Sequence, residues 1–290
     1  MDMENILLQG LYALLSSLSS SFTAIFLKIG VSGKGNAIII NLVKIFIGMI
    51  GLFIITTIYG VNISINFNEI LLLIITALLG PVLAWFSYIK SLERGRISII
   101  HPIVNTYALY AMIFSYIILG SQISVNVLFG FLLILFSIYL ISSDENGGRI
   151  DKKIIIYPCI TSICWGMTSV LFKILLLNNI VLKIAFLRSF FSFIAMASII
   201  LIFSRESLKK IDGKSFLVAC MAGFFSDIVG IFFWFSSLDL GSVAVTTTIS
   251  SSSPVFSSLM SSIIFKYRIP IKRWIGIFLT IIGIAIIYLS

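Results

Sequence analysis

The chain carries the stretch SLERG at residues 91–95 and the similar stretch SLDLG at residues 237–241, which lie 146 positions apart. Gly130 and Gly276 have the same separation. Lys28 and Lys173, at nearly that separation, close two similar apolar stretches that contain threonine. Because the chain has 290 residues, these matches indicate two similar halves, residues 1–145 and 154–290, joined by a polar linker at residues 146–153.

Each half contains five apolar stretches of about the length that a membrane helix needs, roughly 20 residues for a hydrocarbon layer of about 30 Å. With an odd number of crossings per half, the second half enters the membrane upside down relative to the first. Secondary transporters use such inverted repeats to build two alternating gates from one design. The expected spans are residues 5–27, 37–59, 69–90, 97–119, 125–142, 154–177, 182–203, 215–238, 242–265 and 272–289.

The composition supports an all-α polytopic membrane protein of ten helices in a 5+5 inverted repeat. Hydrophobic residues make up 59% of the chain, charged residues only 11%, and the mean hydropathy is +1.15. Soluble domains carry about 25% charged residues. Backbone groups in lipid must bond internally, and the apolar runs lack the alternation of barrel strands, so they predict helices.

The formal net charge of +9 does not indicate a nucleic-acid partner, because the charges sit in short loops between apolar runs. The linker loop carries Arg149, Lys152 and Lys153, and the other odd-numbered loops are also basic, whereas the second, fourth and eighth loops contain no Lys or Arg. The positive-inside rule then places the odd-numbered loops in the cytoplasm and both termini outside the cell membrane. The bilayer and a small-molecule substrate are the expected partners. The oligomeric state stays open, with a monomer among the alternatives.

Three charged residues lie well inside expected spans, at least six residues from either end. Lys44 and Arg188 occupy similar depths, about seven residues into spans two and seven. Each could snorkel back to the headgroups, or each could attract an anionic group such as a substrate carboxylate from its own side. Asp227 lies near the middle of span eight and could be a proton site, a partner for Arg188 or a ligand for a substrate amine.

Other candidate substrate-binding residues are aromatic or polar. Trp85, Trp165 and Trp234 lie within spans, whereas membrane tryptophans prefer the interface, so they indicate either cavity walls or core packing. The chain has one histidine, and a lone histidine near an interface is more often a satisfied polar residue than a base. The candidates are His101, Asn105, Tyr110, Ser250 and Ser253.

Three prolines inside expected spans are candidate hinges. Pro81, Pro102 and Pro254 each remove a backbone hydrogen bond and free a carbonyl group. Transporters place binding sites and hinges at such interrupted helices. Pro254 ends a run of small polar residues whose hydroxyl groups would either allow close helix packing or line a polar path.

These features resemble the drug/metabolite transporter superfamily of the EamA type. The resemblance rests on the basic-aromatic stretch FLRSFF at residues 186–191, its weaker counterpart KIF at residues 44–46, the small-polar run that ends at Pro254, and the glycines 130 and 276. It implies export or exchange of amino acids, related metabolites or drugs without ATP, through a cavity lined by spans one, three, four, six, eight and nine. It also implies cytoplasmic termini, the reverse of the orientation that the charges indicate.

Three classes of function remain: a secondary carrier, a membrane enzyme that acts on lipid-linked substrates, and a scaffold or sensor that transports nothing. The sequence contains no HExxH motif and no GxxxxGK[ST] loop, and Cys159, Cys164 and Cys220 lack metal-ligand spacing. We therefore expect a carrier that is not an enzyme, with no metal and no cofactor.

Overall fold

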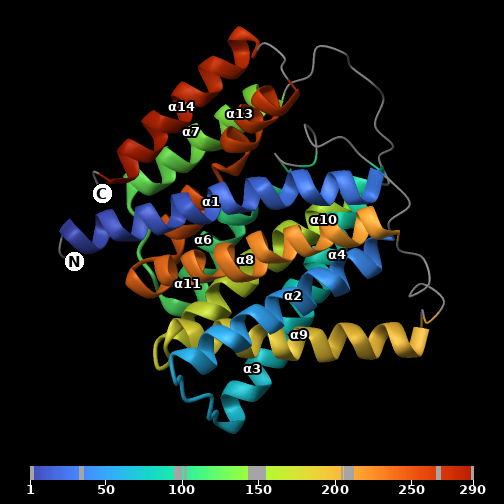
Figure 1. Ribbon diagram of the computed structural model, residues 1–290. Coiled ribbons are helices and arrows are strands. Elements are labelled where there is room, and N and C mark those ends of the chain that lie inside the picture. Colours follow the sequence, from blue (N-terminus) through green and yellow to red (C-terminus); the bar gives the residue numbers. More distant parts are fainter. Residues whose placement is uncertain are drawn as a thin grey trace.

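The computed structural model describes residues 3–32, 36–94, 100, 103–142, 155–203, 205, 212–265 and 269–288, and every regular element among them is a helix (Figure 1). The linker proposed at residues 146–153 lies outside these ranges. The helices are α1 (Met3–Ser32), α2 (Ala37–Ile58), α3 (Phe67–Ala77), η1 (Leu78–Ala84), α4 (Trp85–Arg94), α6 (Tyr107–Leu119), α7 (Val125–Ser142), α8 (Ile156–Leu176), α9 (Val181–Phe203), α10 (Gly213–Gly223), η4 (Phe224–Gly230), α11 (Ile231–Leu240), α12 (Val243–Ser250), α13 (Ser253–Phe265) and α14 (Ile271–Tyr288).

Seven helical segments in the described ranges are long and apolar enough to cross a membrane. Two of them are composite, because α3, η1 and α4 run on as one segment and so do α10, η4 and α11. Two shorter apolar helices, Ile103–Leu119 and Val125–Ile141, lie beside them. The seven segments are Glu4–Val31, Ala37–Ile58, Phe67–Glu93, Ile156–Leu176, Val181–Phe203, Gly213–Leu240 and Ile271–Tyr288.

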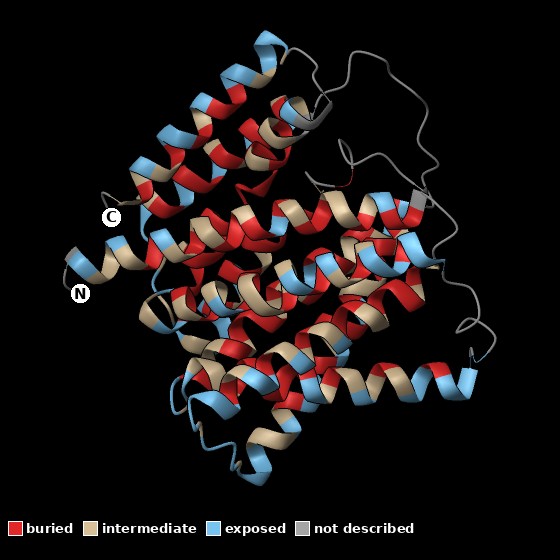
Figure 2. Cartoon of the chain, in the orientation of Figure 1, coloured by how far each residue is buried: buried red, intermediate tan, exposed pale blue. Residues whose placement is uncertain are grey.

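Large apolar side chains cover the outside of the bundle. Phe129, Leu132 and Phe136 on α7 are each more than half exposed, and Figure 2 shows exposed positions along the outward faces of most helices. Hydroxyl groups concentrate inside instead, where Ser and Thr side chains bond to backbone carbonyls four residues back or to neighbouring helices. An apolar exterior around a partly polar interior suits lipid as the surrounding solvent.

The helix expected at residues 242–265 is broken. Helix α12 ends at Ser250, residues 251 and 252 form a turn, and α13 begins at Ser253. Pro254 therefore lies in the first turn of α13, where a missing N–H costs little, and the interruption precedes it. The chain also turns at Thr106, the position 146 residues before Ser252. Both breaks thus fall at corresponding places in the two halves.

Corresponding helices of the two halves begin and end at the same 146-residue separation as the sequence matches. Helices α3 and α10, η1 and η4, α4 and α11, α6 and α13, and α7 and α14 all begin and end 146 residues apart. The packing partners recur as well: α1 packs against α10, η4 and α11, and its counterpart α8 packs against the corresponding elements α3, η1 and α4. The two halves thus have matching internal structure and exchange matching contacts.

Helices α7 and α14 pack closely in antiparallel directions through glycine. A Cβ atom on Gly130 would lie 2.5 Å from Ile287 Cγ1 and 2.7 Å from the Gly283 carbonyl oxygen. A Cβ atom on Gly276 would lie 2.7 Å from Ile141 Cγ1 and 2.8 Å from the Ser137 carbonyl oxygen. The two contacts are equivalent, because Gly276 lies 146 residues after Gly130, and Ile141 and Ser137 lie 146 residues before Ile287 and Gly283.

Substituting either glycine with alanine is expected to destabilise the protein by a similar amount, about 1–3 kcal/mol, because the added methyl group forces the helices apart. Gly213→Ala is the matched control, since a Cβ atom there meets no atom within 4 Å. Thermal unfolding of the purified variants measures the difference. A Gly276→Ala protein as stable as the parent, beside a destabilised Gly130→Ala protein, would contradict the equivalence of the two contacts.

Candidate substrate cavity

A cavity of about 140 Å³ lies in the interior of the bundle. Its walls come from spans one, three, four, six, eight and nine, the set that the family resemblance implies, and Arg188 of α9 adds a seventh. The lining residues are Ser16, Ser20, Gly80, Pro81, Trp85, Tyr88, Val104, Asn105, Tyr107, Trp165, Thr168, Ser169, Phe172, Arg188, Ser226, Gly230, Ile231, Trp234, Ser250 and Ser253.

The cavity is built from corresponding residues of the two halves. Five pairs of lining residues are 146 positions apart, which accounts for ten of the twenty. Both halves therefore meet at this space, and each contributes equivalent positions to its wall. The pairs are Gly80 and Ser226, Trp85 and Ile231, Tyr88 and Trp234, Val104 and Ser250, and Tyr107 and Ser253.

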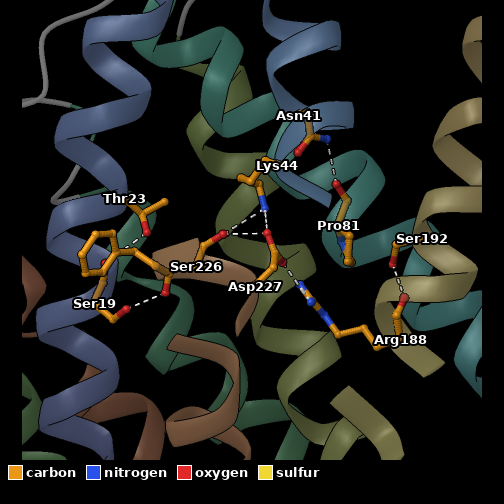
Figure 3. A network of polar contacts seen from close by, with 10 residues as sticks. Ser19, Thr23, Asn41, Lys44, Pro81, Arg188, Ser192, Ser226 and Asp227 are labelled. Carbon is orange, nitrogen blue, oxygen red and sulfur yellow. Dashed lines mark hydrogen bonds and ion pairs between the residues drawn. The ribbon is translucent and has the colours of Figure 1, made fainter. Parts of the chain in front are cut away.

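A buried ion cluster adjoins the cavity. Arg188 Nη1 donates to Asp227 Oδ1 at 3.0 Å, and Lys44 Nζ pairs with Asp227 Oδ2 (Figure 3). Ser226 Oγ donates to the same Oδ2 atom at 2.6 Å and accepts from Lys44 Nζ at 3.2 Å. The exposed fractions of Lys44, Arg188 and Asp227 are 0%, 4% and 1%. Two cations from α2 and α9 thus converge on one acid in η4, and both side chains are buried inside the bundle.

The acid of the cluster lies in the π-helical segment η4, which corresponds to η1 in the first half. The wider turns of both segments leave backbone carbonyls for other donors. Asn41 Nδ2 donates to the Pro81 carbonyl at 2.9 Å, and Thr161 Oγ1 donates to the Ala84 carbonyl at 3.1 Å. Ser19 of α1 donates to the Phe225 carbonyl in η4. Donors from three neighbouring helices therefore hold the two segments in place beside the cavity.

Aromatic rings form much of the wall. Trp85 and Trp165 meet edge to face with centroids 5.1 Å apart, and Tyr88 lies 5.5 Å from Trp165. Phe172 and Trp234 meet edge to face at 6.3 Å on another part of the wall. Lys44 Nζ sits 4.0 Å from the centroid of the Trp85 ring, which adds a cation–π contact between the ion cluster and the wall.

The structure brings most of the sequence candidates together. Lys44 and Asp227 lie behind the wall, in the ion cluster. Tyr110 lies outside the lining and stacks on Phe114 at 6.4 Å, and Pro254 also lies outside it. His101 and Pro102 fall outside the residues that the structure describes. The candidates that line the cavity are Pro81, Trp85, Asn105, Trp165, Arg188, Trp234, Ser250 and Ser253.

Several lining residues were not identified from the sequence. Tyr88 and Tyr107 are the counterparts of the candidates Trp234 and Ser253, so applying the 146-residue separation to each candidate would have found them. Ser226 adjoins Asp227 but offers no separate signal in the sequence.

Two lysines near helix ends make equivalent contacts in the two halves. Lys28 Nζ donates to the Leu92 carbonyl at 2.7 Å, and Lys173 Nζ donates to the Leu238 carbonyl at 2.6 Å. Both acceptors are among the final carbonyls of a helix, which attract cations. The two contacts are equivalent in the two halves, because Leu92 and Leu238 are 146 residues apart.

An apolar helical bundle with this interior defines a multi-pass membrane protein. The family model of EamA-like transporters matches residues 8–143 and 152–289, so the chain belongs to the EamA-like transporter family, within the drug/metabolite transporter superfamily. A protein named "Uncharacterized transporter" from Archaeoglobus fulgidus is 26% identical over 229 residues, covering 79% of each chain. A solved crystal structure matches the fold with a TM-score of 0.79, covering 99% of this chain and 98% of its own, at 16% identity.

Proposed function

We propose that the protein is a secondary carrier that exports or exchanges amino acids or related small metabolites and drugs by alternating access around the central cavity. The five pairs of corresponding residues in the cavity wall carry this proposal. A site shared equally by two similar halves can be exposed to either side of the membrane when the halves change their relative tilt.

The carrier consists of ten helices in two halves of five, inserted in opposite directions. The antiparallel packing of α7 and α14 supports this arrangement, because their equivalent contacts exchange under the repeat. The family match also falls into two segments, one in each half. The start of α1 and the end of α14 lie at the same end of the bundle, where Gly10 contacts Tyr288, as an even number of crossings requires (Figure 1).

The odd-numbered loops face the cytoplasm and the termini face outward in this proposal, because Lys and Arg concentrate in those loops. No group of three or more potential metal ligands occurs in the part of the chain that the structure describes. Because the sequence contains no GxxxxGK[ST] loop for a nucleotide, the proposed transport is driven by gradients or exchange and not by ATP.

Exchange across proteoliposomes tests the proposal. Purified protein is reconstituted, loaded with a mixture of amino acids and related metabolites, and diluted into the same mixture carrying stable isotopes. Mass spectrometry then measures which labelled compounds enter. Entry that depends on an internal counter-substrate supports a carrier. Entry no faster than into protein-free liposomes, for every compound of the mixture, would contradict it.

A further inference from the structure

We propose that the cavity binds a small monoanion with a flat apolar body, of which an aromatic monocarboxylate is the simplest example, and that Arg188 receives the anionic group. The inference rests on the carrier function proposed above and narrows its substrate class. It follows from the charge balance of the ion cluster, the free edge of Arg188, and the size and lining of the cavity.

The ion cluster holds one more positive charge than negative charge. Lys44, Arg188 and Asp227 are the only charged residues that are buried among those described. Both oxygens of Asp227 are occupied, Oδ1 by Arg188 and Oδ2 by Lys44 and Ser226. An uncompensated charge in the interior of a membrane protein is costly, and a bound anion would compensate it.

Arg188 is the cation that a ligand can reach. It lines the cavity, whereas Lys44 is fully buried behind the wall. Arg188 uses Nη1 for Asp227, while its Nε atom is buried without a hydrogen-bond partner among the described residues. A guanidinium edge fits a carboxylate through two parallel hydrogen bonds, and an unpaired buried donor favours a ligand that accepts from it.

The rest of the wall suits a neutral, flat body. No Asp or Glu occurs among the lining residues that the structure describes, so a ligand ammonium group would meet Arg188 without a carboxylate to pair with. The wall instead offers the rings of Trp85, Trp165, Phe172 and Trp234. A water needs about 10–15 Å³ of such space, so 140 Å³ suits a body of on the order of ten non-hydrogen atoms.

Four ligands with one skeleton separate the charge requirement from the apolar contribution. These are 3-phenylpropionate, its neutral amide, the zwitterion phenylalanine and the cation 3-phenylpropylamine. Binding to the purified protein in nanodiscs is measured by tryptophan fluorescence, because Trp85, Trp165 and Trp234 line the cavity. We expect the parent protein to bind the anion about tenfold more tightly than the amide, the zwitterion more weakly than the anion, and the amine most weakly.

Two substitutions are expected to change the affinity for the anion in opposite directions. Arg188→Gln should lower it about tenfold and leave the affinity for the amide nearly unchanged. Asp227→Asn should raise it severalfold, because Asp227 no longer competes for Arg188. General damage to the cavity would instead lower the affinity for both the anion and the amide in both variants. Arg188→Lys, which keeps the charge without the planar fork, should retain part of the preference.

Equal binding of the anion and the amide by the parent protein would overturn the inference, as would equal losses for both ligands in Arg188→Gln. Exchange in proteoliposomes tests the carrier function independently of the binding preference. Exchange of neutral or cationic compounds without preference for the anion contradicts the inference and keeps the carrier. Selective binding of the anion without exchange of any compound supports the binding site and contradicts the carrier.

Discussion

Replacing Asp227 with alanine is expected to lower the thermal unfolding midpoint of the purified protein by about 10 °C. The substitution leaves Lys44 and Arg188 buried and without their shared acid. Removing one partner from a buried ion pair costs about 3–5 kcal/mol, because the remaining charge can neither pair nor reach water. Here two cations lose the same partner, so the cost falls at the upper part of that range.

Asp239→Ala is the matched control, because Asp239 is an exposed acid at the end of the same span and its removal should cost less than about 1 kcal/mol. Adding Lys44→Met to Asp227→Ala should raise the midpoint again, since one of the two uncompensated cations disappears. Lys44→Met alone should lower it, because Asp227 then keeps only Arg188 as an ionic partner. The opposite effects of Lys44→Met on the unfolding midpoint in the parent and in Asp227→Ala directly measure the coupling between Lys44 and Asp227. An Asp227→Ala protein as stable as Asp239→Ala would contradict the ion cluster.

Filling the cavity is expected to reduce exchange in proteoliposomes by about two orders of magnitude while the protein stays folded. Val104→Trp and Ser250→Trp introduce the same large side chain from corresponding positions of the two halves. In a cavity of 140 Å³, an indole ring leaves little room for a substrate. Because the two positions are equivalent, the two variants should lose activity to a similar extent.

Leu201→Trp controls for the added bulk, because Leu201 is half exposed on α9 and its replacement extends into the surrounding solvent. The assay follows whichever compound the parent protein exchanges fastest. Thermal unfolding of each variant shows whether it remains folded. Exchange by Val104→Trp and Ser250→Trp at the rate of Leu201→Trp would place the transport path elsewhere.

The sequence predicts the helical class and most of the internal equivalence. SLERG and SLDLG lie 146 residues apart, and the bounds of helices α3 and α10 differ by the same number of residues. Intramembrane tryptophans also pointed to the cavity, because Trp85, Trp165 and Trp234 all line it. These features follow from hydrophobic length and residue type, which the sequence contains directly.

The geometry of the ion cluster could not be predicted in the same way. The sequence gives the depths of Lys44, Arg188 and Asp227 in their spans, but it does not give the rotation of each helix about its axis, which decides whether they meet. The π-helical turns around Pro81 and Asp227 alter that rotation, and no residue pattern marks their extra residue. Long-range packing therefore decides that Lys44 and Arg188 both pair with Asp227.

Labelling of single cysteines most directly tests the inverted repeat on which the carrier depends. Glu93 and Asp239 are exposed, corresponding residues at the ends of α4 and α11. In a protein with Cys159, Cys164 and Cys220 replaced, Glu93→Cys and Asp239→Cys react with a membrane-impermeant maleimide in intact and in permeabilised cells. We expect Asp239→Cys to react in intact cells and Glu93→Cys only after permeabilisation. Reaction of both cysteines from the same side of the membrane would contradict the inverted repeat.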